Sequence, residues 1–108
     1  MKPLRWRPAA VRDAEAAARW YSTQGGMQLA LDFIDALEAA TTLIADHPAS
    51  GSTRHAAWFP ELPEPLRFVP LERFDRYLVY YLDLPDHVDI IRVWDASRDP
   101  QTLAVNER

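Results

Sequence analysis

The chain has 108 residues, no cysteine and a formal net charge of -4 at pH 7. This length gives room for one domain, residues 1–108, with one modest core, and the lack of cysteine excludes disulfides, thiolate metal sites and cysteine nucleophiles. The acidic balance argues against a general nucleic-acid binder, which needs a basic surface. No apolar run approaches the roughly 20 residues that span a bilayer, so we expect a cytoplasmic protein.

The N-terminal half predicts a short strand followed by two helices. Residues 4–7 alternate as a strand does, and Pro8 suits the first position of a helix that we expect to end near Gln24, before Gly25-Gly26. A second helix is expected from Met27 to about Asp46. Apolar residues recur at three- and four-residue steps in both helices: Ala10, Ala14, Ala17, Ala18 and Tyr21 in the first, and Leu29, Phe33, Leu37, Ala40 and Ile44 in the second. Because only two glycines separate them, the helices should form an antiparallel hairpin.

The C-terminal half predicts strands. Runs of aromatic and β-branched residues place them near residues 56–59, 66–71, 76–82 and 88–94, and the polar turn between the last two indicates an antiparallel hairpin. Prolines at 60, 63, 65 and 70 should keep the middle of this region irregular. The predicted fold is therefore α+β, with an N-terminal strand and an antiparallel two-helix hairpin packed on a mostly antiparallel sheet of about four strands.

Several local patterns occur in an order that resembles a known family. They are the β-α-α-β-β-β order, Pro48-x-x-Gly51, Leu66-Arg67, Tyr77-Leu78-Val79-Tyr80, and Ile90-Ile91-Arg92-Val93 followed by Arg98-Asp99. Together they look like the RelE/ParE toxin superfamily, and within it the ParE branch, over the chain from Leu4 to about Asp99.

This resemblance implies a bacterial toxin of a type II toxin–antitoxin system, held inactive in a hetero-oligomer with a cognate antitoxin protein. ParE-like members inhibit DNA gyrase, whereas RelE-like members cleave messenger RNA in the ribosome. On the ParE interpretation the toxin has no chemistry of its own, and we expect gyrase to be bound by Arg92, Trp94 and Arg98, supported by the tail 101–108. A non-toxic member that only binds antitoxin is a further alternative.

The nuclease alternative would need cations to stabilise a phosphorane, together with an acid and a base. Arg67 and Arg92 could supply the cations, and Tyr80 or His87 could transfer a proton. However, the position after the last strand, where many relatives place a histidine, holds Asp95, whose charge would repel phosphate. We therefore favour gyrase poisoning and keep the ribosome-dependent endoribonuclease as the alternative.

Simpler explanations stay open for these site candidates. Arg67 and Arg92 could pair with acidic residues across neighbouring strands, and Trp94 could cap the core. Arg98 could form a local salt bridge with Asp99. Tyr80 shares a strand face with Leu78 and Leu82, which predicts a core residue with its hydroxyl at the edge.

The antitoxin is expected to fold across the helical hairpin and part of the sheet. The apolar candidates for its contacts are Trp20, Tyr21, Leu29 and Trp58, and the acidic ones are Asp32 and Asp35, which otherwise form a solvated face. No cofactor is expected. His47, His55 and His87 lack the spacing of metal ligands, so no metal is expected either.

Overall fold

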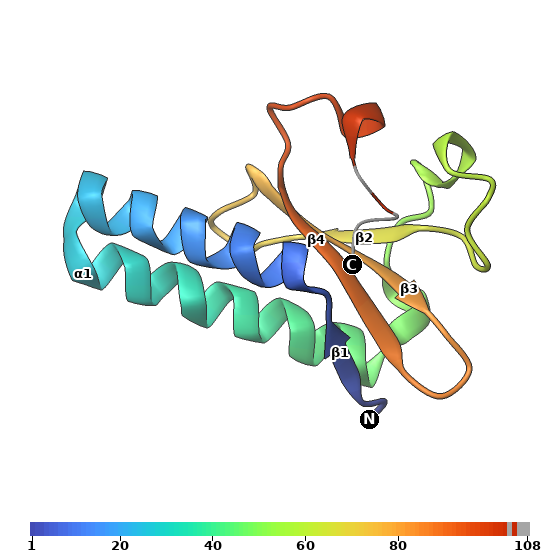
Figure 1. The fold of residues 1–108 in the computed structure, drawn as a ribbon. Coiled ribbons are helices and arrows are strands. Elements are labelled where there is room, and N and C mark those ends of the chain that lie inside the picture. Colours follow the sequence, from blue (N-terminus) through green and yellow to red (C-terminus); the bar gives the residue numbers. More distant parts are fainter. Residues whose placement is uncertain (104, 106–108) are drawn as a thin grey trace.

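The structure is a computed structural model and describes residues 1–103 and 105. Its elements are β1 (Leu4–Trp6), α1 (Pro8–Asp46), β2 (Arg67–Pro70), β3 (Tyr77–Asp83) and β4 (Val88–Asp95), with short 3₁₀ turns η1 (Pro48–Ser50), η2 (Ala56–Trp58) and η3 (Pro100–Thr102). Figure 1 shows α1 lying along one side of the sheet. The predicted α+β fold is confirmed. Within residues 1–103 and 105, no helix is long and apolar enough to cross a membrane.

The helical hairpin is one helix with a single break. Gly26 has φ 87° and ψ 177°, the only non-helical backbone inside α1, and the chain reverses there so that two arms run antiparallel side by side (Figure 1). The prediction of a hairpin is confirmed, with one difference: Gly25 remains in the first arm, and Gly26 alone makes the turn. Glycine is needed because that backbone conformation is almost closed to residues with a Cβ atom.

The sheet has the order β1-β4-β3-β2. The pairs β2–β3 and β3–β4 are antiparallel, whereas β1 runs parallel to β4, with Leu4 opposite Val88 and Trp6 opposite Ile90. The sheet is therefore mixed, although mostly antiparallel. Since β1 pairs over three residues only, the second half of β4 lies at an open edge of the sheet.

A β-bulge in β4 changes which side chains face the helices. Tyr80 pairs with Arg92 but Tyr81 pairs with Ile90, so Ile91 is the extra residue. As a result Ile90 and Val93 both reach the core under α1, while Ile91 and Trp94 lie on the opposite face. Without the bulge, simple alternation would have placed Arg92, and not Val93, on the same face of the sheet as Ile90.

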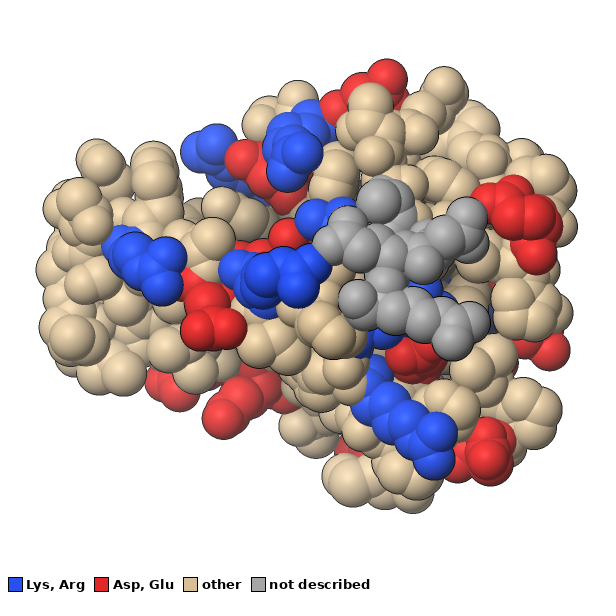
Figure 2. Space-filling model, viewed as in Figure 1, with Lys and Arg blue, Asp and Glu red and all other residues tan. Residues whose placement is uncertain are grey.

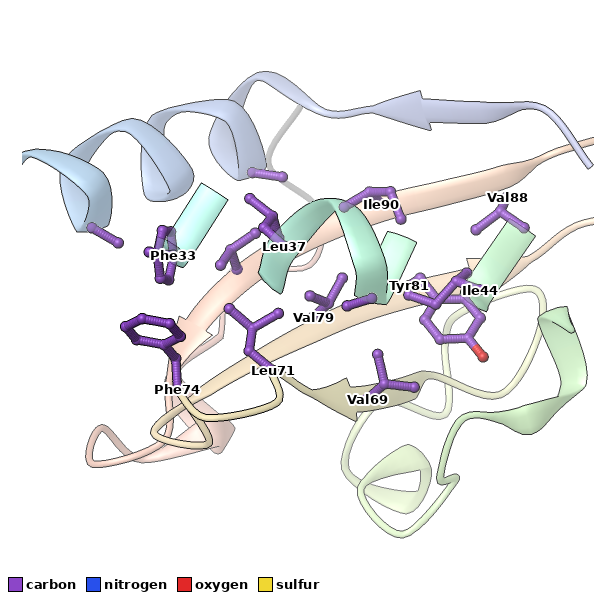
Figure 3. Close-up of a cluster of buried hydrophobic side chains, with 14 residues drawn as sticks. Phe33, Leu37, Ile44, Val69, Leu71, Phe74, Val79, Tyr81, Val88 and Ile90 are labelled. Carbon is purple, nitrogen blue, oxygen red and sulfur yellow. The ribbon is translucent and has the colours of Figure 1, made fainter. Parts of the chain in front are cut away.

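Both faces of the sheet are covered. Under α1, Phe33, Leu37 and Ile44 meet side chains from the sheet, as Figure 3 shows. This confirms the apolar stripes predicted for the helices. A second cluster on the other face contains Phe59, Leu66, Phe68, Tyr80, Leu82, Ile91, Trp94, Leu103 and Val105. Coverage on two sides explains why β3 and β4 read as continuous apolar runs.

The strand predicted near residues 56–59 is wrong. Ala56–Trp58 form the 3₁₀ turn η2, and Phe59 enters the second cluster. The following prolines lack an N–H group and cannot maintain a strand ladder. Contact with the edge strand β2 is made instead through an isolated bridge between Ser52 and Phe68.

The Pro48-x-x-Gly51 segment is held by hydrogen bonds to a tyrosine of β3. The Tyr81 hydroxyl donates to the Pro48 carbonyl at 2.6 Å and accepts from the Gly51 N–H at 2.9 Å. A Cβ atom at position 51 would collide with that hydroxyl. The glycine is therefore required by close approach.

Candidate interaction site

The predicted target-binding residue Arg92 is fixed by a carboxylate from α1. Its Nε and Nη2 donate to the two oxygens of Asp13 at 2.7 and 2.8 Å, and Asp13 also accepts the backbone N–H of Val93 at 3.1 Å. Asp13 thus satisfies an edge N–H of β4 beyond the point where β1 ends. The pairing expected for Arg92 exists, but with a helix and not with a neighbouring strand.

A second arginine–carboxylate pair lies at the end of β4. Arg76 contacts Asp95 at 2.9 Å through Nη2, and the N–H and hydroxyl of Ser97 donate to the same carboxylate at 2.9 and 2.8 Å. Chiefly because Arg76 donates to it, the pKa of Asp95 is lowered to about 2. Asp95 is therefore an anion at any physiological pH.

Trp94 and Arg98 lie together, but only Arg98 is exposed. The Trp94 side chain is 2% exposed within the second cluster, and its ring has the Arg92 guanidinium 5.0 Å and the Arg98 guanidinium 4.3 Å from its centroid. Its indole N–H points to the Arg98 carbonyl at 3.4 Å. Asp99 accepts the Gln101 N–H and so caps η3. Burial of Trp94 supports the core role among the alternatives.

A groove of about 290 Å³ lies between the first arm of α1 and the ends of β3 and β4. We call it the arginine groove; it is lined by Asp13, Ala16, Ala17, Trp20, Arg76, Tyr77, Val93, Asp95 and Arg98. Trp20 is 46% exposed, with the Arg76 guanidinium 5.5 Å from its ring centroid. Figure 2 shows Lys and Arg interspersed with Asp and Glu on the face of the molecule drawn there. The groove offers small residues, one exposed tryptophan and fixed charges of both signs, which suits binding to a protein surface.

The nuclease candidates do not form one cluster. Arg67 donates to the carbonyls of Ala49 and Gly51, both at 2.9 Å, and His87 contacts Asp86 at 2.7 Å in the turn before β4. Only Tyr80 and Arg92 are cross-strand neighbours.

Tyr80 is fully buried, as its strand face predicts. Its hydroxyl lies 2.8 Å from Nδ1 of His55, and burial raises the pKa of Tyr80 to about 12. A phenol with such a pKa is a poor proton donor or acceptor near neutrality.

The predicted antitoxin contacts fall on two sides of the molecule. Trp20, Tyr21, Leu29, Asp32 and Asp35 belong to α1, where Asp32 accepts from Arg73 at 2.9 Å and Asp35 is exposed. Tyr21 is half-buried among the rings of Phe33, Phe74 and Tyr77. Trp58 is 42% exposed and stacks on His55, which stacks on Phe68 of the opposite sheet face. One antitoxin segment would have to pass around the sheet edge to contact both groups.

Three contributors to these sites escaped the sequence interpretation: Asp13, Arg76 and His55. Arg76 had a weak signal, because it adjoins Tyr77, the cross-strand partner of Asp95. Asp13 and His55 had none, because each acts through residues far away along the chain.

The element order and the strand order define a small α+β domain in which a helical hairpin covers one face of a mixed four-stranded sheet. The family described as "ParE toxin of type II toxin-antitoxin system, parDE" matches residues 4–100, and the chain belongs to this family. A solved structure titled "Chromosomal ParDE TA system from P. aeruginosa" is similar in fold, with a TM-score of 0.69, 22% identity, and coverage of 86% of this chain and 94% of that one. No curated protein matches the chain. The resemblance predicted from the sequence is confirmed.

Proposed function

We propose that this ParE-family toxin binds DNA gyrase and traps it with cleaved DNA, and that a cognate antitoxin neutralises it. The observation that carries the proposal is the family match over residues 4–100. The breaks would then come from the active site of gyrase, so the toxin needs a binding surface and no catalytic group.

The arginine groove is the surface that we assign to gyrase. Arg98 is exposed beside it, and Arg76 and Trp20 form its wall. Arg92 contributes indirectly, because it donates two hydrogen bonds to Asp13, which lines the groove. Trp94 supports it as the buried ring beneath Arg98.

The assay is to incubate the purified toxin with gyrase, plasmid and ATP, denature the protein, and measure linear plasmid against a known gyrase poison. We expect linear plasmid with the unaltered toxin, and at least tenfold less with Arg98→Glu. The matched control is Arg5→Glu, an exposed arginine at β1, which should leave the amount unchanged. Arg92→Glu is a poorer probe, because it would set a second carboxylate against Asp13 and threaten the fold.

Each negative result has a definite meaning. No linear plasmid with folded toxin would refute gyrase poisoning, and message cleavage in a translation extract would then favour the endoribonuclease. Equal activity of Arg98→Glu and Arg5→Glu would remove Arg98 from the contact surface.

Neutralisation is tested separately by co-expression with the small protein encoded next to the toxin gene. We expect growth to be restored, and restoration to weaken when Asp32→Ala and Asp35→Ala, which lie outside the arginine groove, are combined. Unchanged restoration would place the antitoxin away from the acidic side of the second arm of α1.

A further inference from the structure

One face of the α1 hairpin exposes large apolar side chains to solvent. They lie outside the core, and they line neither the arginine groove nor the hollow between α1 and β2. Their exposed fractions run from 40% to 66%, and they are Val11, Met27, Leu31 and Ile34. Contiguous apolar surface of this kind marks an interaction site. We call the side of the hairpin opposite the sheet its outer face.

Two exposed charged residues, Arg19 and Asp35, point to the outer face. A residue two positions further along a helix lies about 200° further round the helix axis. Arg19 comes two positions after Ala17, which is buried toward the sheet. Asp35 comes two positions after Phe33, which is buried in the same cluster. Both charged side chains are therefore turned away from the sheet.

Arg19 and Asp35 also lie at the same height on the two arms. The rings of Tyr21 and Phe33 are in contact between the arms, with centroids 5.2 Å apart, so positions 21 and 33 are about level. Two residues further from the turn on each arm are Arg19 and Asp35. The outer face thus carries a cation on one arm and an anion beside it on the other.

The charges of the two arms determine how two outer faces could pack. Both arginines of α1, Arg12 and Arg19, are on the first arm, whereas the second arm has four acidic residues and no basic one. A two-fold axis parallel to the arms places the first arm of each copy over the second arm of the other, so that Arg19 faces Asp35. A two-fold axis across the arms would place acidic second arms against each other. The outer face is therefore self-complementary about the parallel axis.

The size of the outer face suits a reversible dimer. Each arm is about 28 Å long, and two helices side by side are about 20 Å wide. Such a face has an area of roughly 560 Å², so two copies would bury about 1,100 Å² in total. A specific interface needs at least about 1,000 Å². The hairpins reach this limit narrowly, which predicts dissociation in the micromolar range.

We propose that the chain, when free of antitoxin, forms a two-fold dimer in which the outer faces of two α1 hairpins pack as a four-helix bundle. Arg19 of each copy pairs with Asp35 of the other, and the exposed apolar side chains become buried between them. Burial of apolar surface stabilises the dimer, and the charge pairs fix its orientation. Asp35 is also a candidate antitoxin contact, so the dimer is a state of the toxin alone. Neither residue lines the arginine groove.

The test is sedimentation equilibrium of the purified protein over a range of concentrations, without gyrase or antitoxin. We expect a monomer–dimer equilibrium, with at least tenfold weaker association for Arg19→Glu and for Asp35→Arg. The double variant Arg19→Glu/Asp35→Arg exchanges the charges and should restore association. The matched control is Arg5→Glu, which changes the net charge as Arg19→Glu does but lies on β1, and it should associate normally. Circular dichroism confirms that each variant is folded.

A second measurement tests the orientation of the two copies. The chain has no cysteine, so Arg19→Cys and Asp35→Cys each introduce a single thiol. A short bis-maleimide should link the two variants efficiently when they are mixed, and each variant poorly to itself. The proposal is overturned if the protein stays monomeric at all concentrations, if the double variant fails to restore association, or if either cysteine variant links to itself as well as the mixture does.

Discussion

Among single residues, Asp13 has the largest structural role at the end of the sheet. Its carboxylate accepts two hydrogen bonds from Arg92 and one from the Val93 N–H. The Asp13 side chain is only 16% exposed and the Arg92 side chain only 12%. Removing the carboxylate would take the two Asp13 hydrogen bonds from a mostly buried guanidinium, which is costlier than losing a surface pair.

Asp13→Ala is therefore expected to lower the free energy of unfolding by about 3 kcal/mol. Urea denaturation monitored by tryptophan fluorescence measures this change. Glu15→Ala removes an exposed acid from the same arm of α1 and should stay within about 0.5 kcal/mol of the unaltered protein. Similar losses for both variants would show that the Arg92 pair contributes nothing specific.

Asp95 predicts a pH dependence. Its pKa is lowered to about 2 in the folded protein, mainly by Arg76, whereas an unfolded aspartate titrates near 3.9. The stabilisation is therefore complete above the unfolded pKa and is lost as the pH falls through about 2. Because the Arg76 side chain is 51% exposed, we expect at most about 1 kcal/mol.

An NMR titration of the Asp95 carboxyl group tests this expectation directly. In Arg76→Gln the pKa should rise toward its ordinary value, and the acid-dependent loss of stability should shrink. Arg19→Gln, which neutralises an arginine of α1, should leave the Asp95 pKa low. If the Asp95 pKa stays low in Arg76→Gln, the hydrogen bonds from Ser97, and not Arg76, are the main cause of the low pKa.

At the scale of elements, the two glycines at the tip of α1 have different roles. Gly26 has a φ of 87° with open space around its Cβ position, whereas a Cβ on Gly25 would meet the flexible end of Leu29. Gly26→Ala should therefore destabilise the protein by about 1–3 kcal/mol through backbone strain alone. Gly25→Ala should be near neutral, because gained helix propensity offsets the contact with Leu29.

Thermal unfolding followed by circular dichroism compares these two variants in one experiment. The melting temperature should fall clearly for Gly26→Ala and change little for Gly25→Ala. The reverse order would mean that the close contact at Leu29, and not the backbone conformation, limits the hairpin.

Most elements could be predicted because their signals are local. The spacing of Phe33, Leu37 and Ile44 alone indicates a helix face, and Gly26 marks its turn. The bulge at Ile91 could not be predicted, because it depends on how β4 pairs with β3 and leaves no pattern in β4 itself. That bulge decides that Val93 faces α1, next to the Asp13 carboxylate that accepts its N–H.

For the whole molecule, the candidate sites depend on contacts between distant parts of the chain. Asp13 and Arg92 are 79 positions apart, and His55 and Tyr80 are 25 apart. Sequence patterns identified the exposed Arg98 and the strand face of Tyr80. They could not show that Trp94 would be buried, because its cover comes from the C-terminal segment.

That segment leads to the last prediction. Leu103 and Val105 are 4% and 3% exposed in the second cluster, and Arg7 next to β1 donates to the Val105 carbonyl. The described part of the predicted target-binding tail is thus partly core, while residues 104 and 106–108 lie outside the described residues.

Leu103→Ala should lower the free energy of unfolding by about 2–3 kcal/mol, because it opens a cavity beside Trp94 and Tyr80. Gln101→Ala, an exposed neighbour in η3, should change it by less than about 0.5 kcal/mol. Urea denaturation measures both variants, and the tryptophan emission of the folded state should shift to the red only for Leu103→Ala as water approaches Trp94. An unchanged midpoint and emission for Leu103→Ala would mean that the C-terminal segment does not cover the second face of the sheet in solution, leaving that face open to partners.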